Sequence, residues 1–370
     1  MGDRQVILCA GNPGSGRDEY IQKMLALFNS DGRIKYYHFY DYLLQTLRSD
    51  GYNLNKETIL DFVANNQRET ERIRAATIDE ICEEMGDSGI HVVSTPYSFE
   101  WNGELIYGLT ANDARKLNPD KFIVLLDDIV RIKERLRQDP QWSDKEFTLV
   151  ELTKWRRTEV DGIEALAHQF DPPKEFYILP VEHNPKVLFE LVTNARKKKI
   201  YLSYPITSTT EEERARTAEF ARQIEDLYII FDPITIKEWS LVEQWNEERD
   251  KAKGKKGRMP ESIKCSISYE LGDKTYECDS EEIRHAIRDI RHQIVERDYM
   301  LINASDYVVA YHQRRQISAG VICELVHGKT NGKFVYVMYP YEPSPFLEYY
   351  SHRLFTSTEQ LLEFLKKAAE

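Results

Sequence analysis

The feature that most constrains the fold of this chain is a series of short apolar runs that alternate with amphipathic stretches, and the series occurs twice. The first series starts at residues 5–10 (QVILCA), and the second starts at residues 200–206 (IYLSYPI). The apolar runs have the length of buried strands, and the stretches between them carry apolar residues at helical spacing. This alternation is typical of parallel sheets joined by crossover helices. The sequence therefore predicts an α/β protein.

The length of the chain and its composition fit two domains. With 370 residues and 41% hydrophobic residues, each half is large enough for a core of its own. A basic run ends at Lys199, directly before a new apolar strand, so we predict domains over 1–196 and 197–370. Five strand signals in the second domain suggest a flavodoxin-like or Rossmann-like fold. Two β-rich runs around Gly272-Asp273 predict an inserted hairpin near 250–280.

The charge of the chain bears on its partners. A formal net charge of −12 argues against a nucleic-acid polymer or an anionic membrane as the main partner. No segment approaches the roughly 18 consecutive apolar residues of a membrane span. The five cysteines have neither metal-ligand spacing nor the pattern of a disulfide framework in so long a chain. These features predict small-molecule partners, no metal site built from cysteines, and a cytoplasmic location.

A phosphate-binding loop is predicted directly after the first strand. Residues 11–18 (GNPGSGRD) follow the frame G-x-x-x-x-G-K-[ST] in the order strand, loop, helix. Backbone N–H groups and the positive end of the helix would surround an anion. The candidate phosphate-binding residues are Gly11, Gly14, Ser15, Gly16, Arg17 and Asp18. A tight strand-to-helix turn without a ligand is the alternative.

The last two positions of this loop depart from the motif. Arg17 keeps a positive charge where the motif has lysine. Asp18 replaces the hydroxyl that ligates magnesium, and a carboxylate there either binds the metal directly or repels the phosphates. The departures leave open whether the domain transfers phosphate or only binds a nucleotide.

The stretch 5–195 resembles adenylate-kinase-type nucleoside monophosphate kinases, most closely the archaeal form. Asp41, the segment 91–97 and the segment 116–140 lie where that family has its monophosphate site, its central strand and its lid-bearing helix. The resemblance implies ATP and magnesium as ligands. It also implies arginines that close over the phosphates, although each of them taken alone is more typical of a helix surface: Arg135, Arg137, Arg156 and Arg157.

Three pieces of the second half suggest a glycosidic-bond site. Tyr201 and Ser203 lie where a strand ends, at the sheet edge that binds ligands in open α/β folds. Asp298 continues a stripe of isoleucines on a helix, so its carboxylate is expected to point toward the core, near the unfavourable end of the helix dipole. A buried aspartate paired with a neighbouring arginine or histidine is the alternative.

The third piece is the segment 318–324 (SAGVICE). Ser318 occupies a helix N-cap position, Gly320 allows a ligand to approach the backbone, and Glu324 follows on the helix. A capped helix with a surface glutamate is the alternative for this piece alone.

Together the pieces resemble the nucleoside 2-deoxyribosyltransferase family, and more closely its branch of 2′-deoxynucleoside 5′-monophosphate N-glycosidases. The matching features are a strand-end tyrosine, an R-D pair, a D-x-V-V-A strand and the pattern S-x-G-x-x-x-E-L: Tyr201, Arg297 and Asp298, Asp306 to Ala310, and Ser318 to Leu325. The resemblance implies that Glu324 attacks the anomeric carbon and that Asp298 assists proton transfer, with Tyr201 also in the catalytic set.

The same resemblance implies the ligand and the assembly. Ser203, Ser318 and Gly320 are the implied substrate-binding residues, no cofactor is needed for the cleavage, and a homo-oligomer is implied. Members that act on free nucleosides have aspartate at the position of Ser318, and that charge would repel a 5′-phosphate. The sequence therefore favours a nucleotide substrate.

Three hypotheses follow. The first is cleavage or transfer of the N-glycosidic bond of a (deoxy)nucleoside 5′-monophosphate, with the kinase-like domain binding or supplying a nucleotide. The second is a nucleoside monophosphate kinase with a binding-only partner domain. The third is a non-catalytic sensor of a nucleotide or of NAD.

Overall fold

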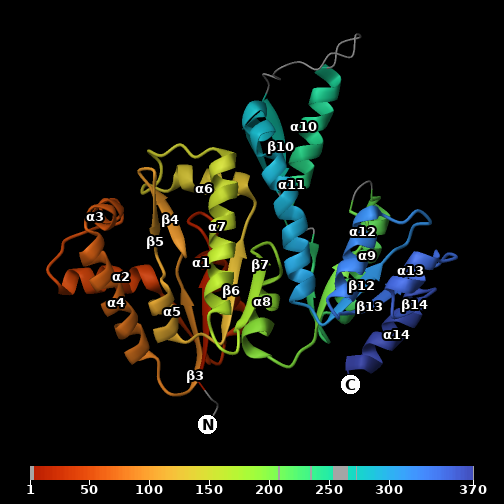
Figure 1. The fold of residues 1–370 in the computed structure, drawn as a ribbon, viewed down its shortest axis with the longest axis horizontal. Helices are drawn as coiled ribbons and strands as arrows, with labels where there is room; N and C mark the ends of the chain where they lie inside the picture. Colours follow the sequence, from red (N-terminus) through yellow and green to blue (C-terminus); the bar gives the residue numbers. More distant parts are fainter. Residues whose placement is uncertain (1–3, 207–208, 234–235, 253–265, 272, 370) are drawn as a thin grey trace. The chain divides into compact units, whose positions relative to one another are not determined.

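The computed structural model of the protein describes residues 4–206, 209–233, 236–252, 266–271 and 273–369 (Figure 1). The chain divides into two compact units. Unit 1 comprises Met1–Pro185 and Ile236–Ile294, and unit 2 comprises Lys186–Thr235 and Val295–Glu370. Each unit contains a parallel five-stranded sheet, which confirms the predicted α/β class. No helix of the described residues is both long and apolar enough to cross a membrane.

The sheet of unit 1 has the order β2-β3-β1-β6-β7. All four neighbouring pairs in it are parallel. Its strands are β1 (Arg4–Ala10), β2 (Ile34–His38), β3 (Gly89–Ser94), β6 (Lys121–Leu126) and β7 (Glu175–Pro180). The helices between them, and the small hairpin of β4 and β5, are α1 (Arg17–Phe28), α2 (Phe39–Ser49), α3 (Ile59–Asn65), α4 (Gln67–Glu84), β4 (Ser98–Trp101), β5 (Glu104–Tyr107), α5 (Ala111–Leu117), α6 (Ile129–Gln138) and α7 (Leu149–His168).

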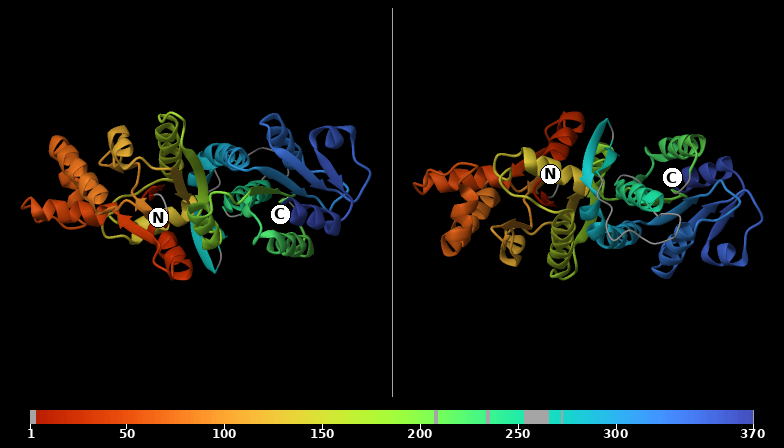
Figure 2. Two further views of the ribbon diagram at one scale, coloured as in Figure 1. Left: turned by 90° about the horizontal axis from the view of Figure 1, so that it is seen from below. Right: turned by 90° about the horizontal axis from the view of Figure 1, so that it is seen from above.

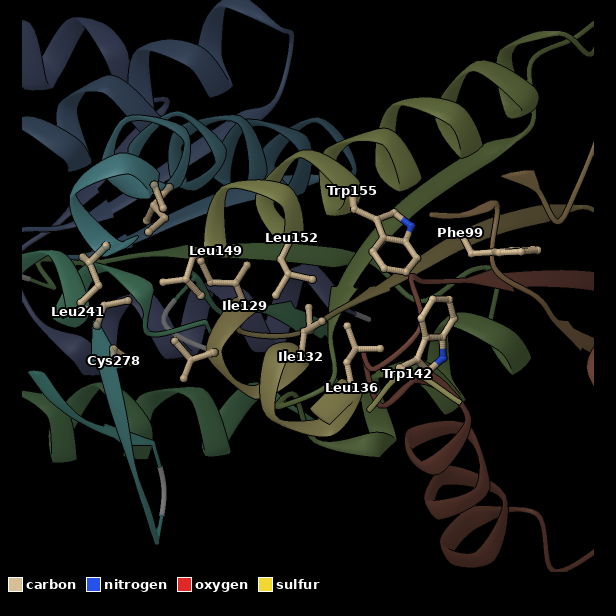
Figure 3. Close-up of a cluster of buried hydrophobic side chains, with 14 of the residues drawn as sticks. Phe99, Ile129, Ile132, Leu136, Trp142, Leu149, Leu152, Trp155, Leu241 and Cys278 are labelled. Carbon is tan, nitrogen blue, oxygen red and sulfur yellow. The ribbon is translucent and has the colours of Figure 1, made fainter. Parts of the chain in front are cut away.

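The inserted segment packs on unit 1, although the sequence led us to expect it in the second domain. It contains α10 (Glu238–Ala252), the antiparallel strands β10 (Ser266–Leu271) and β11 (Lys274–Asp279), and the first part of α11 (Ser280–Asn303). Residues 253–265 and 272 of the predicted insertion lie outside the described residues. Leu241 and Cys278 share one apolar cluster with Ile129 of α6 and Leu149 of α7 (Figure 3). Burial of this apolar surface explains the grouping.

Buried polar contacts reinforce this packing. Arg156 of α7 and Glu238 of α10 form an ion pair with 2.5 Å between Nη1 and Oε1, and both side chains are almost inaccessible. The hydroxyl of Tyr269 donates to Asp128 Oδ2 at 2.7 Å. Removing one partner by substitution would leave the other charged group buried without its counter-charge, so these contacts are costly to lose.

The sheet of unit 2 has the order β14-β13-β12-β8-β9, with all neighbours parallel. Numbered along the chain this is 2-1-3-4-5, the flavodoxin-like order, with its topological switch point between β8 and β12. The strands are β8 (Lys199–Ser203), β9 (Ile229–Phe231), β12 (Tyr307–Tyr311), β13 (Phe334–Met338) and β14 (Arg353–Phe355).

Helices cover both faces of this sheet (Figure 2). Apolar residues of α9 (Glu211–Ile224) and α14 (Thr358–Ala369) share a buried cluster with Leu202 and Val309. On the other face, α12 (Ala319–Thr330) approaches Val308 so closely at Gly328 that an added Cβ would lie 2.7 Å from the valine side chain.

The remaining helices of unit 2 are α8 (Pro185–Thr193) and α13 (Pro345–Tyr350). We expected α8 in the first domain, within residues 1–196. It groups with unit 2 almost entirely, because the boundary between the units falls after Pro185. Lys186 at its start forms an ion pair with Asp226, with 2.5 Å between Nζ and Oδ1.

Candidate functional site

The polar residues of unit 2 meet at the switch point of its sheet. Ser203 ends β8, and Glu324 lies on α12, which follows the neighbouring strand β12. The Ser203 hydroxyl donates to Oε2 of Glu324. Glu324 is only 9% exposed, so it is not the surface glutamate that the segment 318–324 alone would allow. Crevices at such switch points bind the ligands of open α/β sheets.

Tyr201 faces the same side of β8 as Ser203, because side chains two apart on a strand point the same way. It is fully buried, and its hydroxyl has no hydrogen-bond partner among the described residues. Burial raises the pKa of Tyr201 well above its ordinary value, and the nearby Glu324 and Asp298 carboxyls raise it further. The phenol therefore stays protonated, with a hydroxyl hydrogen available to a ligand or to Glu324.

Asp298 lies on the last turns of α11 and is 13% exposed at its side chain. Its nearest cation, Arg297, is 3.9 Å away between Nε and Oδ1, which is at the limit of an ion pair. Neither of these two atoms has a hydrogen-bond partner among the described residues. The alternative of a paired, structural aspartate is therefore poorly supported by the geometry.

The stripe of isoleucines on α11 explains the burial of Asp298 only in part. Ile283 and Ile290 pack into the apolar cluster of unit 1, whereas Asp298 belongs to unit 2. The helix α11 thus contributes residues to both units. The stripe predicted that Asp298 is buried, but not that it belongs to a different unit from the isoleucines.

The two buried acids have shifted pKa values. Burial raises the pKa of Glu324 to about 8, and the Asp298 carboxyl contributes to the increase, while Ser203 and Tyr201 oppose it. Burial also raises the pKa of Asp298 to about 6, against the effect of Arg297. Because the carboxyls interact, they titrate as a pair. Between about pH 6 and 8 the pair holds one proton, and the higher pKa of Glu324 places that proton on Glu324 while Asp298 is ionised.

The start of α12 offers a place for an anion. Ser318 is the N-cap residue, but its side chain makes no capping hydrogen bond. A Cβ added at Gly320 would meet only Ser318 Oγ, at 3.7 Å. Backbone N–H groups in this first turn therefore remain accessible at the positive end of the helix.

Sequence reasoning missed one acid near this site. The Tyr204 hydroxyl donates to Asp232 Oδ1 at 2.6 Å, and Asp232 contributes to the raised pKa of Asp298. Asp232 directly follows β9, whose carboxyl end adjoins that of β8. An acid directly after a predicted strand, Asp232 in IIFDP, was the available signal.

In unit 1 the predicted phosphate loop borders a cavity of about 560 Å³. Gly14 and Gly16 adopt left-handed backbone conformations, with φ of 77° and 76°, and Gly16 is the N-cap of α1. Arg135 lies over the loop, since a Cβ on Gly16 would lie 3.0 Å from its Nη1 atom, which also donates to the Gly14 carbonyl at 2.9 Å. The cavity is lined by Asn12, Pro13 and all of the predicted loop residues except Gly11.

Arg17 and Asp18 bind each other at the wall of the cavity. Arg17 Nε and Nη2 lie 3.0 and 2.7 Å from the two Asp18 oxygens, and Nη1 donates to the Gly11 carbonyl at 2.8 Å. Asp18 Oδ1 also accepts from Tyr36 at 2.8 Å and from Ser94 at 2.6 Å. Burial alone would raise the pKa of Asp18, but Arg17 and His38 hold it well below its ordinary range.

These contacts decide whether the loop fits magnesium. A carboxylate offers about four lone-pair sites. Oδ1 of Asp18 accepts from Arg17, Tyr36 and Ser94, and Oδ2 accepts from Arg17 and has His38 Nε2 3.5 Å away. The side chain at the metal-ligand position therefore has no site to spare, and it does not fit direct coordination of magnesium. No cluster of three potential metal ligands occurs in the part of the chain that the structure describes.

Only one of the four arginines that the kinase resemblance implied lines the cavity, namely Arg135. Arg156 is only 3% exposed and is bound to Glu238, so the expectation that it closes over phosphates is wrong for this conformation. Arg157 is exposed and Arg137 lines a different cavity. Asp41 accepts a hydrogen bond from His38 Nδ1 at 2.9 Å but does not line the cavity.

Comparison with known proteins bears on unit 1. Residues 10–149 match the family AAA_17, described as an AAA domain, so the N-terminal part of the chain is an AAA_17 P-loop domain. A domain of this type suggests nucleotide binding or kinase-like activity, and it is consistent with ATP and magnesium as ligands. The contacts of Asp18 are the point at which this loop departs from that expectation.

The chain was also compared with curated proteins and with solved structures. No curated protein matches the chain. Among solved structures, the chain is similar to a crystal structure of a conserved protein from Enterococcus faecalis V583, with 18% identity and a TM-score of 0.26. That similarity covers 46% of this chain and 98% of the other.

Proposed function

We propose that unit 2 cleaves or transfers the N-glycosidic bond of a (deoxy)nucleoside 5′-monophosphate, with Glu324 as the nucleophile. The observation that carries this proposal is a buried Glu324, held by Ser203 and close to Tyr201 and Asp298, at the switch point of a flavodoxin-like sheet. A pair of neighbouring carboxyl groups is typical of retaining glycosyl transfer. Here the proposed nucleophile, and not the acid, has the higher pKa, so the proton of the pair must be redistributed before reaction. The resemblance to nucleoside 2-deoxyribosyltransferases points to the same chemistry.

The first step forms a covalent intermediate. Glu324 Oε2 is bound by Ser203, so we assign the attack on C1′ of the sugar to Oε1. The reactive form has the single proton of the pair on Asp298, so this proton must first move there from Glu324, where the higher pKa places it. The C1′–N bond then breaks, its electron pair stays on the base, and Asp298 donates that proton to the departing base. The products are a glycosyl ester on Glu324 and a free neutral base.

The second step regenerates the enzyme. A water molecule, or a second base in the transfer reaction, attacks C1′ and gives its proton to the Asp298 carboxylate. The bond between C1′ and Glu324 breaks, and the carboxylate is restored. With water the product is a sugar 5-phosphate, and with a second base it is a new nucleotide.

The 5′-phosphate fits the start of α12. The Ser318 hydroxyl makes no capping bond, so it is free to donate to a phosphate oxygen, and the exposed Gly320 lets the phosphate reach the backbone N–H groups. A helix N-terminus favours such an anion. This arrangement supports a nucleotide over a nucleoside.

The test uses a panel of ribo- and deoxynucleoside monophosphates and the matching nucleosides, and chromatography measures the free base released from each. We expect release from at least one monophosphate, and a loss of about 10³-fold or more in Glu324→Gln with the fold intact. Cys323→Ser, an exposed neighbour on α12, is the control and should keep wild-type activity. Wild-type rates in Glu324→Gln would refute the assignment.

A second candidate function belongs to unit 1. The loop, its cavity and the AAA_17 match support nucleotide binding there. The sequestered Arg156 and the occupied Asp18 favour binding over phosphoryl transfer. ADP formation from ATP in the presence of a nucleoside monophosphate, measured alongside base release, distinguishes a kinase from a binding domain. NAD is included in the same panel as a ligand for the sensor hypothesis.

A further inference from the structure

Two buried side-chain oxygens in the loop of unit 1 lack a hydrogen-bond partner among the described residues, although Asn12 Nδ2 donates to the Pro13 carbonyl. Ser15 and Asn12 are each 1% exposed, and both line the 560 Å³ cavity. Ser15 Oγ and Asn12 Oδ1 have no hydrogen-bond partner among the described residues. Buried polar atoms are almost always paired in folded proteins, so these two atoms point to a ligand beside the loop. Ser15 is suited to donate to a phosphate oxygen, and Asn12 to accept from a ligand hydroxyl.

The charges around the loop limit how much negative charge this ligand can carry. Arg17 is neutralised by Asp18, with 2.7 Å between Nη2 and Oδ2. Arg135 is neutralised by Asp127, with 2.6 Å between Nη1 and Oδ2. The loop thus offers N–H groups and a helix end but little net positive charge. A single phosphate, with a charge of about −1.5 to −2 at neutral pH, suits this environment better than a triphosphate does.

A triphosphate normally binds together with magnesium, which offsets its charge. Here the side chain at the metal-ligand position, Asp18, is already held by protein donors. Arg17, Tyr36 and Ser94 donate to Oδ1 of Asp18, and Arg17 and His38 lie against Oδ2. The carboxylate is still 29% exposed toward solvent, so it would repel phosphates placed beyond the first one. The loop therefore discriminates against the Mg–ATP complex that P-loop domains commonly bind.

The rest of the cavity suits a nucleoside. Its volume lies within the range of small-molecule sites. Apolar and aromatic side chains form part of its wall, where a planar base would find contact area. They include Leu43, Leu60, Val63, Phe99 and Trp142.

We propose that the loop of unit 1 binds the phosphate of a nucleoside monophosphate without a divalent metal, with the base against this apolar wall. The phosphate lies at the N-terminus of α1 and accepts from Ser15. This proposal concerns unit 1 alone and does not depend on the chemistry proposed for Glu324.

Calorimetry on the full chain tests the proposal. The Glu324→Gln variant serves as the background, so that no ligand is consumed during the titration. Adenosine, guanosine, cytidine and uridine 5′-monophosphates are titrated with magnesium or with a chelator, and ATP is titrated with magnesium. We expect a loop-dependent site whose Kd for one monophosphate changes less than about twofold between magnesium and chelator, and which binds Mg–ATP at least about tenfold more weakly.

Loop variants assign the signal to unit 1. Ser15→Ala removes the unpartnered hydroxyl with little change in volume and should weaken monophosphate binding about tenfold. Gly16→Val forces a side chain against Arg135 and should abolish the site. If Gly16→Val fails to fold, Ser15→Ala alone carries the assignment. Binding unchanged in Ser15→Ala overturns the proposal.

Asp18→Asn tests the discrimination against polyphosphates. Removing the carboxylate charge frees Arg17 for the ligand, so the preference for monophosphate over Mg–ATP should shrink about tenfold. Asp31→Asn makes the same change of charge at an exposed position outside the loop and should have no effect. A wild-type site that binds Mg–ATP more tightly than every monophosphate overturns the proposal, as does a tenfold gain in monophosphate affinity on adding magnesium.

Discussion

Both units place polar residues where a parallel strand leads into a helix, but they treat their charged groups in opposite ways. In unit 1 the charges near the loop are paired internally, as in Arg17 with Asp18 and Arg156 with Glu238. In unit 2 the buried charged groups Asp298 and Arg297 each keep an atom without a hydrogen-bond partner among the described residues, whereas the partnerless atoms near the loop of unit 1, on Ser15 and Asn12, belong to neutral side chains. Satisfied charges hold a structure together, whereas buried groups with spare hydrogen-bonding capacity are typical of sites that act on a ligand.

The largest effect on stability should come from breaking the pairing in unit 1. Glu238→Gln leaves the Arg156 guanidinium buried without its counter-charge, which should reduce the free energy of unfolding by about 3–5 kcal/mol. Denaturant titration of the full chain measures it. The control is Arg157→Gln, which removes an exposed ion pair with 3.4 Å between Arg157 Nε and Asp161 Oδ2 and should cost less than about 1 kcal/mol. Equal losses in the two variants would contradict the structural role given to the buried pair.

Unit 2 should show the opposite behaviour, because its buried acids reduce stability when they ionise. Folding raises the pKa of Glu324 from 4.5 to about 8 and that of Asp298 from 3.8 to about 6. Such groups contribute full stability below pH 4, and the contribution is lost as pH rises from about 4 to 8. Glu324→Gln cannot ionise, so it should melt several degrees above the wild type at pH 8 and close to it at pH 4. Scanning calorimetry at both pH values checks this, and parallel pH dependence in the two proteins would argue against a buried, ionising Glu324.

The same pair predicts the pH dependence of base release. Activity requires one carboxylate and one acid, so kcat/KM should be greatest between about pH 6 and 8 and fall on both sides. Asp298→Asn cannot donate a proton and should lower the maximum and flatten the profile. A profile of Asp298→Asn with wild-type height and shape would remove Asp298 from the proposed mechanism.

The smallest effect should come from the anion site at the start of α12. The wild type should prefer a nucleoside monophosphate to the matching nucleoside. Ser318→Asp should reduce that preference at least tenfold, since a carboxylate near a phosphate costs on the order of a few kcal/mol at an effective dielectric near 20. Comparing kcat/KM for both substrates measures it. If the preference is the same in both proteins, Ser318 is only an N-cap residue and the nucleotide assignment should be given up.

Local signals predicted much of the architecture. The alternation of apolar runs was sufficient to predict the two parallel sheets, and the glycine pattern after QVILCA was sufficient to predict the loop between β1 and α1. The structure also brings Tyr201, Ser203 and Glu324 together, as expected from strand ends that meet at one sheet edge. Their catalytic roles remain a prediction.

Contacts between distant residues could not be predicted in this way. Glu238 and Tyr269 bind Arg156 and Asp128, residues far away in the chain, and one glutamate on an amphipathic helix gives no sign of its partner. The donors that occupy Asp18 come from three separate elements, so its saturation could be recognised only in three dimensions.

The central claim is that Glu324 forms a covalent bond to the sugar, and trapping that bond tests it most directly. The full chain would be incubated with 2′-deoxy-2′-fluoronucleoside 5′-monophosphates, whose fluorine slows breakdown of the intermediate, then quenched and examined by peptide mass spectrometry. We predict a fluorodeoxyribose-phosphate adduct on the peptide that contains Glu324, released base in equal amount, and no adduct in Glu324→Gln. Base release from the natural monophosphate combined with an adduct on a different residue would contradict the account, as would an adduct that persists in Glu324→Gln.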